Sequence, residues 1–258
     1  MAFFYLKAAW NAYWNHLKLG VSFGILLVFV LLFLFFENLE ITSGSVFSDY
    51  AVQGISPEVL AVEAVLVLLF LAMYAVLVSL TVLAVRRDYS HLKVEYYLRE
   101  MIQKFFLKIF FFYTAMILLF LVLVSGAVYL EWNILLVNAF LLVISLLVLF
   151  VPQAIVVDEQ STRHSISSSI EFVFKHFPQY AFVVVVSILL VLLIPALEFV
   201  VDQYFLVGRF VSLLLVFVFV IPFIEILKSM VYMMRFSLIH HPSQVIQEQF
   251  HKRSPGRA

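Results

Sequence analysis

Residues 59–85 read VLAVEAVLVLLFLAMYAVLVSLTVLAV, a run of 27 residues in which Glu63 is the one charged side chain. A helix rises about 1.5 Å per residue, so this run can cross the hydrocarbon core of a bilayer, which is about 30 Å thick. Polar and apolar residues do not alternate along it, which excludes a membrane barrel strand. We therefore predict a membrane-spanning helix.

Five further runs of the same kind occur along the chain. They cover residues 19–36, 109–130, 134–157, 180–201 and 210–234. Hydrophobic residues make up 65% of the 258 and charged residues 12%, against roughly 45–50% and 25% in soluble domains. A backbone in lipid must satisfy its own hydrogen bonds. We predict an all-α, polytopic membrane protein with six transmembrane helices.

The first run, 19–36, is also the place where a cleaved signal peptide would be sought. It is followed by Glu37-Asn38-Leu39-Glu40, whereas a cleavage site has small residues. We expect this span to be retained.

The basic residues are divided unequally between the two sides of the predicted membrane. Fifteen of the 16 Lys and Arg residues lie before span one, between spans two and three, between spans four and five, or after span six. Arg209 alone lies on the other side, which carries Glu37, Glu40, Asp49, Glu58, Glu131, Glu198 and Asp202. The positive-inside rule predicts cytoplasmic N- and C-termini in a plasma or inner cell membrane.

Three segments on the basic side, at about residues 3–17, 94–105 and 166–177, have apolar residues at helical spacing opposite polar ones. They predict three cytoplasmic interfacial helices that contact membrane lipids and anionic headgroups. An alternative is that any basic segment beside a membrane tends to be amphipathic. With the hairpins that follow, they predict three units, about 1–87, 88–160 and 161–241, in one membrane domain, 1–241. Residues 242–258 form a polar cytoplasmic tail.

Glu225 is the acidic residue nearest the middle of a span, and Lys228 lies three residues on, on the same helical face. An isolated carboxylate in hydrocarbon costs about 2.5–3.5 kcal/mol or more, so Glu225 needs a partner. The pair predicts an ion, proton or headgroup site, or a structural ion pair whose lysine reaches the cytoplasmic surface. We favour the structural interpretation.

Other candidates within the spans are weaker. Pro152, Pro195 and Pro222 fall in or near the ends of spans four, five and six, where proline can bend a helix. Broken helices build the binding sites of transporters. Proline is also common in membrane helices for packing alone. Asn138 and Ser145 lie seven apart on one face of span four and predict hydrogen bonds between helices more than ligand contacts.

Motifs for reaction chemistry are missing. There is no cysteine, which excludes disulfides and thiolate sites, no histidine within a span, and no phosphate loop, HExxH or GxSxG motif. His240 and His241 are adjacent and cannot share a helical face. We therefore expect no catalytic residue, cofactor or metal, and no basic domain for nucleic acid.

The segment from Phe150-Val151-Pro152 to Asp158-Glu159, followed by Ser165-Ile166 and Ser169-Ile170, resembles a broad group of prokaryotic six-span membrane proteins. Pro222 with Tyr232 and Arg235 extends the resemblance. This group is similar to the membrane domain attached to some glycerophosphodiester phosphodiesterases. The resemblance implies a six-span fold but no hydrolysis, because no soluble phosphodiesterase barrel is present, and it implies no catalytic residues.

These patterns predict a non-enzymatic membrane-organising or accessory subunit with a basic cytoplasmic face and, in that role, a membrane-protein partner. The second hypothesis is a small permease or lipid-handling transporter that uses Glu225 and Lys228, and the third is an intramembrane enzyme. A cavity lined by Glu225 would favour transport, whereas a filled bundle would favour partner binding.

Overall fold

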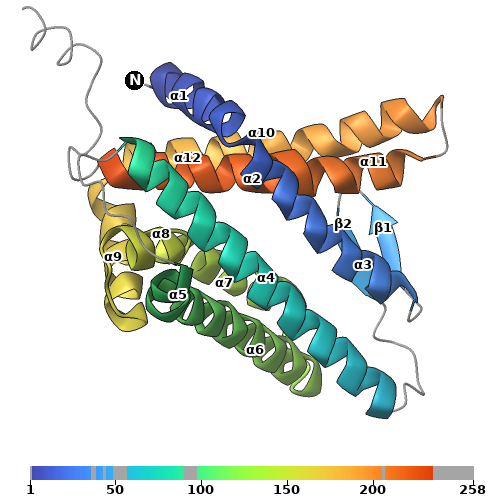
Figure 1. Ribbon diagram of the computed structural model, residues 1–258. Coiled ribbons are helices and arrows are strands. Elements are labelled where there is room, and N and C mark those ends of the chain that lie inside the picture. Colours follow the sequence, from blue (N-terminus) through green and yellow to red (C-terminus); the bar gives the residue numbers. More distant parts are fainter. Residues whose placement is uncertain are drawn as a thin grey trace, which may run out of the picture.

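The computed structural model describes residues 2–35, 39–42, 45–48, 57–89, 98–204 and 207–234, nearly all of them helical (Figure 1). The predicted all-α class is confirmed. The α-helices are α1 (Ala2–Asn15), α2 (Leu17–Ser22), α3 (Leu26–Phe35), α4 (Pro57–Tyr89), α5 (Leu98–Met101), α6 (Leu107–Tyr129), α7 (Ile134–Leu147), α8 (Val151–Val157), α9 (Thr162–Lys175), α10 (Phe177–Asp202), α11 (Gly208–Leu215) and α12 (Ile221–Met233).

Three shorter helical turns and one hairpin complete the described structure. The 3₁₀ turn η1 (Phe23–Ile25) joins α2 to α3, and the π turns η2 (Ile102–Phe106) and η3 (Val216–Val220) join α5 to α6 and α11 to α12. Strands β1 (Leu39–Thr42) and β2 (Ser45–Ser48) pair antiparallel between α3 and α4, with Leu39 opposite Ser48. The sequence analysis did not predict this hairpin.

The membrane spans follow the predicted runs. Five helical stretches are long and apolar enough to cross a bilayer: Ala61–Asp88, Ile102–Tyr129, Ile134–Val157, Phe177–Asp202 and Gly208–Met233. A sixth candidate includes a bend of 73° between Tyr5–Asn15 and Leu17–Leu32. The chain is therefore a multi-pass helical membrane protein.

Helix α1 is the separate amphipathic helix predicted before the first span. It packs against α12 and buries Tyr5, Ala9, Ala12 and Tyr13, which recur on one helical face. The opposite face exposes large side chains, among them Trp14 at 53%. Small alanines in the contact let the two helices approach closely, while the exposed indole is suited to a membrane interface.

The second predicted interfacial helix is not separate where the structure describes it. Residues 98–106 form α5 and η2, which continue directly into α6, and residues 90–97 lie outside the described residues. The apolar positions Met101 and Phe105 are buried in the core instead of facing the membrane surface. This segment therefore extends the third span, a correction to the prediction.

Helix α9 forms the third predicted amphipathic helix, and its inward face combines serines with Phe172 and Val173. Ser165, Ser168 and Ser169 are buried together with Phe172 against the rest of the protein, whereas Phe174 is 73% exposed. Most of the predicted apolar stripe therefore faces the core, because Val173 is buried there and Ile166 packs against the same cluster. Ser165 donates to the Ser161 carbonyl and Ser168 donates to Gln160 Oε1. Ser169 bonds to backbone of the fourth span, as described for the site below.

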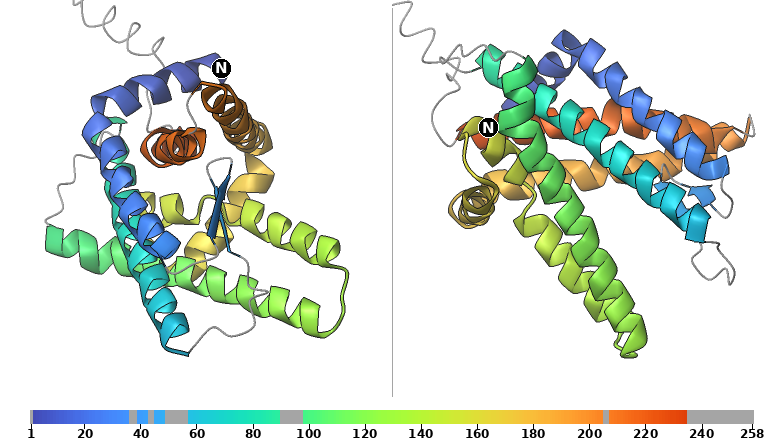
Figure 2. Two further views of the ribbon diagram at one scale, coloured as in Figure 1. Left: turned by 90° about the vertical axis from the view of Figure 1, so that its right-hand side faces the viewer. Right: turned by 60° about the horizontal axis from the view of Figure 1, so that its bottom comes forward.

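The order of an amphipathic segment followed by a helical hairpin recurs along the chain, but the packing of the spans is unequal. Half of the most apolar part of Gly208–Met233 is buried, and 39% of that of Ala61–Asp88, against 11% for Ile102–Tyr129. Helix α12 packs against α1, α4, α8 and α10, while α6 and α7 form a hairpin at one side (Figure 2). Similarity among the three units stays a prediction.

The connection from α8 to α9 is tied to α4 by a buried guanidinium. Arg86 Nη1 donates to the Val156 carbonyl at 2.8 Å and to Glu159 Oε1 at 3.0 Å. Glu159 has φ 55°, a left-handed backbone conformation that is rare for residues other than glycine. The adjacent Asp158 accepts a hydrogen bond from the Tyr232 hydroxyl of α12 at 2.7 Å. These contacts hold α8 beside α4 and α12.

Candidate functional site in the helix bundle

The site is built around a buried ion pair on α12. Glu225 and Lys228 are 3% and 5% exposed, and Lys228 Nζ lies 2.6 Å from Glu225 Oε1. A spacing of three residues places both side chains on one face of the helix. The predicted ion pair is confirmed. The prediction that Lys228 reaches the cytoplasmic surface is wrong, because its side chain is enclosed by the bundle.

Two neighbouring helices bring further donors to the carboxylate. The Tyr74 hydroxyl of α4 donates to Glu225 Oε1 at 3.3 Å, and Gln153 Nε2 of α8 donates to Oε2 at 2.8 Å. Gln153 is fully buried, and its Oε1 has no hydrogen-bond partner among the described residues. With Lys228, three side chains from three helices satisfy the carboxylate, which compensates for its removal from water.

Helix α8 has this position because the fourth span is interrupted. Residues 148–150 form a turn between α7 and α8, and Pro152 follows at the start of α8. Proline has no N–H and cannot complete the helical hydrogen bond to the Val148 carbonyl, which instead accepts the Val151 N–H at 3.1 Å. The regular hydrogen-bond pattern of the helix is therefore broken between α7 and α8, although both belong to one candidate span, Ile134–Val157.

A serine from α9 satisfies the backbone at this interruption. The Ser169 hydroxyl donates to the Leu147 carbonyl at 2.8 Å and accepts the Phe150 N–H at 3.2 Å. Both backbone groups belong to a region from which water is excluded, where an unpaired polar group is costly. Ser169 thus stabilises the broken span from outside it.

Replacement of Ser169 by Ala is expected to lower the free energy of unfolding by about 1–3 kcal/mol, because it leaves a buried N–H and a partly buried carbonyl without the serine as partner. The matched control is Ser187→Ala, since the Ser187 hydroxyl donates only to Val183 within its own helix, at 2.8 Å. Unfolding in mixed micelles measures both variants. Equal loss of stability in the two would contradict this role for Ser169.

The sixth span is continuously helical but irregular next to the site. The π turn η3 comes directly before α12, and Pro222 occupies the first turn of α12. Pro222 leaves the Val218 carbonyl without its usual helical donor, and the Tyr13 hydroxyl of α1 donates to that carbonyl at 3.0 Å. Irregular turns of this kind inside helices are frequent at functional sites.

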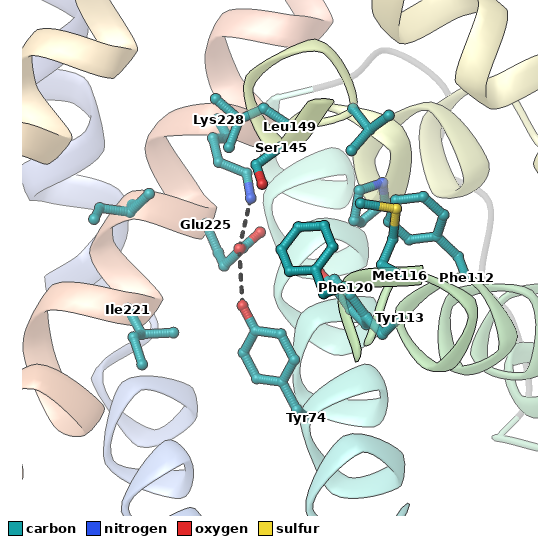
Figure 3. Close-up of a pocket in the computed structure, with 13 residues that line it drawn as sticks. Tyr74, Phe112, Tyr113, Met116, Phe120, Ser145, Leu149, Ile221, Glu225 and Lys228 are labelled. Carbon is teal, nitrogen blue, oxygen red and sulfur yellow. Dashed lines mark hydrogen bonds and ion pairs between the residues drawn. The ribbon is translucent and has the colours of Figure 1, made fainter. Parts of the chain in front are cut away.

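A pocket of about 400 Å³ is lined by residues at both irregularities, among them Val148, Leu149 and Ile221 (Figure 3). Glu225 and Lys228 line it on one side, with the Tyr74 hydroxyl bonded to Glu225, and aromatic rings of α6 complete the lining. The lining residues are Tyr74, Phe112, Tyr113, Met116, Phe120, Ser145, Val148, Leu149, Pro152, Ile221, Ile224, Glu225 and Lys228. The pocket is mostly apolar, with one pair of opposite charges at one wall.

The structure collects some of the predicted site residues here and not others. Ser145 and Pro152 join Glu225 and Lys228 at the pocket. The Ser145 hydroxyl donates to Leu141 in its own helix at 2.8 Å, so the predicted bond between helices is not made by this serine. Asn138 is exposed on α7, away from the pocket lining.

The three predicted helix-kink prolines have different environments. Pro152 and Pro222 are buried and follow the irregular turns at the site. Pro195 is exposed and lies inside α10, which continues as one helix from Phe177 to Asp202. Two of the three prolines therefore mark the irregularities that shape the pocket.

Two members of the site, Tyr74 and Gln153, were not found by sequence reasoning. Gln153 is a polar residue next to Pro152 in an apolar span, which is a signal that could have identified it. Tyr74 stands among apolar residues of α4, but tyrosine is too frequent in this chain to be distinctive. Its role as a donor to Glu225 depends on how α12 packs against α4.

No set of three His, Asp or Glu side chains that could hold a metal ion occurs in the part of the chain that the structure describes. His240 and His241 lie outside those residues. In comparisons with known proteins, no family model, curated protein or solved structure matches the chain.

Proposed function

We propose that this protein is a small permease or lipid-handling membrane protein that binds an amphiphilic molecule in the pocket at Glu225 and Lys228. The observation that carries the proposal is the position of this pocket, about 400 Å³ in volume, beside the turn in the fourth span and the π turn in the sixth. Ligand sites of transporters are commonly built where spanning helices are discontinuous.

The lining supports an amphiphile more than a small polar solute. Ligand pockets combine apolar walls with a few polar groups that orient the ligand. Here the polar groups are concentrated at Glu225 and Lys228, while Met116, Phe120 and Ile224 are among the apolar residues. Helix α6 contributes four of the lining residues, Phe112, Tyr113, Met116 and Phe120, and its span buries only 11% of its most apolar part. A molecule dissolved in the bilayer therefore reaches this side of the bundle readily.

A photoreactive acyl lipid with its reactive group in the chain tests the proposal in proteoliposomes. We expect crosslinks on pocket residues such as Met116 and Ile224, and movement of a fluorescent lipid across the bilayer that is faster than in protein-free vesicles. Ser145→Phe, which fills the pocket, should reduce both signals. Ser187→Phe on α10 is the control, because Ser187 is not a pocket residue.

Two results would overturn the proposal. One is labelling confined to the outward faces of α6 and α7. The other is lipid movement that Ser145→Phe leaves unchanged.

The non-enzymatic accessory role expected from the sequence becomes the second candidate. The observation that favours it is the exposure of the α6–α7 hairpin, where Leu135 and Leu136 are 70% and 66% exposed. Such a surface suits lipid or another membrane protein. Co-purification in mild detergent of one stoichiometric partner, together with absence of lipid binding in the pocket, would favour this role. Neither candidate assigns a catalytic residue, and an intramembrane enzyme remains third.

For location, we propose a plasma or inner cell membrane with both termini in the cytoplasm, and basic residues against anionic headgroups on that side. The support is the division of 15 basic residues against Arg209. The resemblance to the membrane domain of glycerophosphodiester phosphodiesterases remains a proposal on the residues named for it.

The proposed orientation predicts different labelling of two single cysteines. The natural chain has no cysteine, so Ser45→Cys and Ser254→Cys each introduce a unique thiol. An impermeant maleimide applied to intact cells should label position 45 and leave position 254 unlabelled until the membrane is opened, because the two lie on opposite sides. Equal labelling of both before opening would show that the orientation is wrong.

A further inference from the structure

The two charged groups at the pocket differ in how many of their hydrogen-bonding positions have a partner. Glu225 accepts from Lys228, Tyr74 and Gln153. Lys228 has three N–H donors, of which one bonds to Glu225 and the others have no acceptor among the described residues. The Lys228 ammonium therefore has N–H donors to offer a ligand. Those donors suit an anionic group such as a phosphate.

The net charge of the site limits what such a ligand can carry. Glu225 and Lys228 neutralise each other, and the other lining residues are uncharged. A ligand with a net negative charge would leave one charge uncompensated in a region of low dielectric, which is strongly unfavourable. A headgroup that carries both an anionic and a cationic group adds no net charge. The electrostatics therefore favour a zwitterion over an anion.

The aromatic part of the lining offers a place for the cationic part of that headgroup. Tyr74 and Tyr113 have ring centroids 5.2 Å apart, and Phe112 and Phe120 line the same pocket. A quaternary or primary ammonium is attracted to aromatic faces through cation–π interactions. Figure 3 shows the rings of Tyr113 and Phe120 across the pocket from Lys228. The remaining surface is apolar and suits an acyl chain.

We infer that the pocket binds a zwitterionic amphiphile, with its anionic group at Lys228, its ammonium against the aromatic wall and its chain along the apolar lining. This inference rests on the proposed function, because it names the class of amphiphile that the same site takes. It distinguishes zwitterionic lipids from acidic and uncharged ones.

The test compares three probes with the same acyl chain and different headgroups: lysophosphatidylcholine, lysophosphatidate and monoacylglycerol. The full-length protein is kept in dodecyl maltoside micelles, and bound probe is counted by native mass spectrometry over a titration. We expect lysophosphatidylcholine to bind about tenfold or more tightly than the other two. Monoacylglycerol lacks the charge-assisted hydrogen bond to Lys228, and lysophosphatidate brings a net negative charge that the site does not compensate. Equal binding of the three would overturn the inference.

A double substitution tests the assignment without leaving a single buried charge. Glu225→Gln with Lys228→Met should fold, should still bind monoacylglycerol, and should lose the preference for lysophosphatidylcholine. The matched control is Glu171→Gln with Lys175→Met, an exposed pair on α9 whose Nζ and Oε1 are also 2.6 Å apart. If the preference survives in the first variant, or disappears in the control, the inference is wrong.

Two further outcomes separate this inference from the function on which it rests. If no probe binds at all and no lipid crosslinks to the pocket, the proposed function itself fails. If the three probes bind equally at the pocket, the proposed function stands and the zwitterion assignment fails. Free phosphocholine is a fourth probe, which has the headgroup but no acyl chain. If it binds as tightly as lysophosphatidylcholine, the ligand is a water-soluble zwitterion and not a lipid.

Discussion

Replacing Lys228 by Met, with Glu225 left in place, is expected to destabilise the protein by about 3–5 kcal/mol. The substitution removes the ammonium 2.6 Å from Glu225 and leaves a carboxylate that is 3% exposed with only neutral donors. Tyr74 and Gln153 still donate to it, but neither carries a charge to offset its desolvation. Glu225→Gln alone should also be destabilising, because it leaves the ammonium of Lys228 buried without its counter-charge.

The two substitutions together should fold about as well as the natural protein. A buried ion pair can often be replaced by uncharged residues of similar size at little cost, because the desolvation penalty of both charges is removed at the same time. Equilibrium unfolding in mixed micelles measures the three variants, and the double-mutant cycle isolates the interaction of the pair.

The exposed pair Glu171 and Lys175 on α9 is the control for this series. Its side chains are 53% and 69% exposed, so each single substitution there should change stability by no more than about 0.5 kcal/mol. A double variant at Glu225 and Lys228 that is as unstable as either single one would refute a simple charge balance. It would mean that one of the two side chains is needed for packing or for other hydrogen bonds.

Arg86→Met is the second substitution with a large expected effect, about 2–3 kcal/mol of lost stability. The Arg86 side chain is 10% exposed and donates to the Val156 carbonyl at the end of α8 and to Glu159. Without it, the buried carbonyl loses its charged donor. Glu159 is 34% exposed and has Lys104 at 3.5 Å, so its carboxylate remains solvated and contributes little to the loss.

The neighbouring residue Arg87 provides a matched comparison. Its side chain is 63% exposed and lies 3.6 Å from Asp88, an exposed ion pair for which Arg87→Met should cost about 0.5 kcal/mol or less. Because Arg86 anchors the end of α8, Arg86→Met should also weaken lipid binding at the pocket, while Arg87→Met should not. Equal stability of the two variants would show that the contact of Arg86 with α8 is not important.

The membrane class and the spans could be predicted from the sequence because lipid acts on each segment separately. Residues 134–157 were predicted as a span, and the structure has a candidate span with the same bounds, Ile134–Val157. Length and hydrophobicity decide this outcome, and both are local properties. The pairing of Glu225 with Lys228 was also predictable, since a spacing of three residues on one helix requires no knowledge of its neighbours.

The segment at residues 94–105 shows where local patterns are insufficient. An amphipathic pattern fits a helix lying along the membrane surface, and it fits equally well the end of a span that emerges beside other helices. In both cases one face meets an apolar environment. The structure has the second arrangement for residues 98–106, because Met101 and Phe105 pack into the core. Only the neighbouring helices distinguish the two.

Tertiary structure alone decided the environment of the ion pair and the existence of the pocket. Gln153 and Glu225 are 72 residues apart in the chain, and Tyr74 and Glu225 are 151 apart, so no local pattern relates them. Lys228 was expected at the membrane surface because its depth in an isolated helix permits that; the surrounding helices bury it instead. The sequence by itself determined which segments enter the lipid, because transfer from water to hydrocarbon depends on the composition of each segment. Which polar groups meet inside the bundle depends on how broken helices pack, and that is a property of the assembled fold.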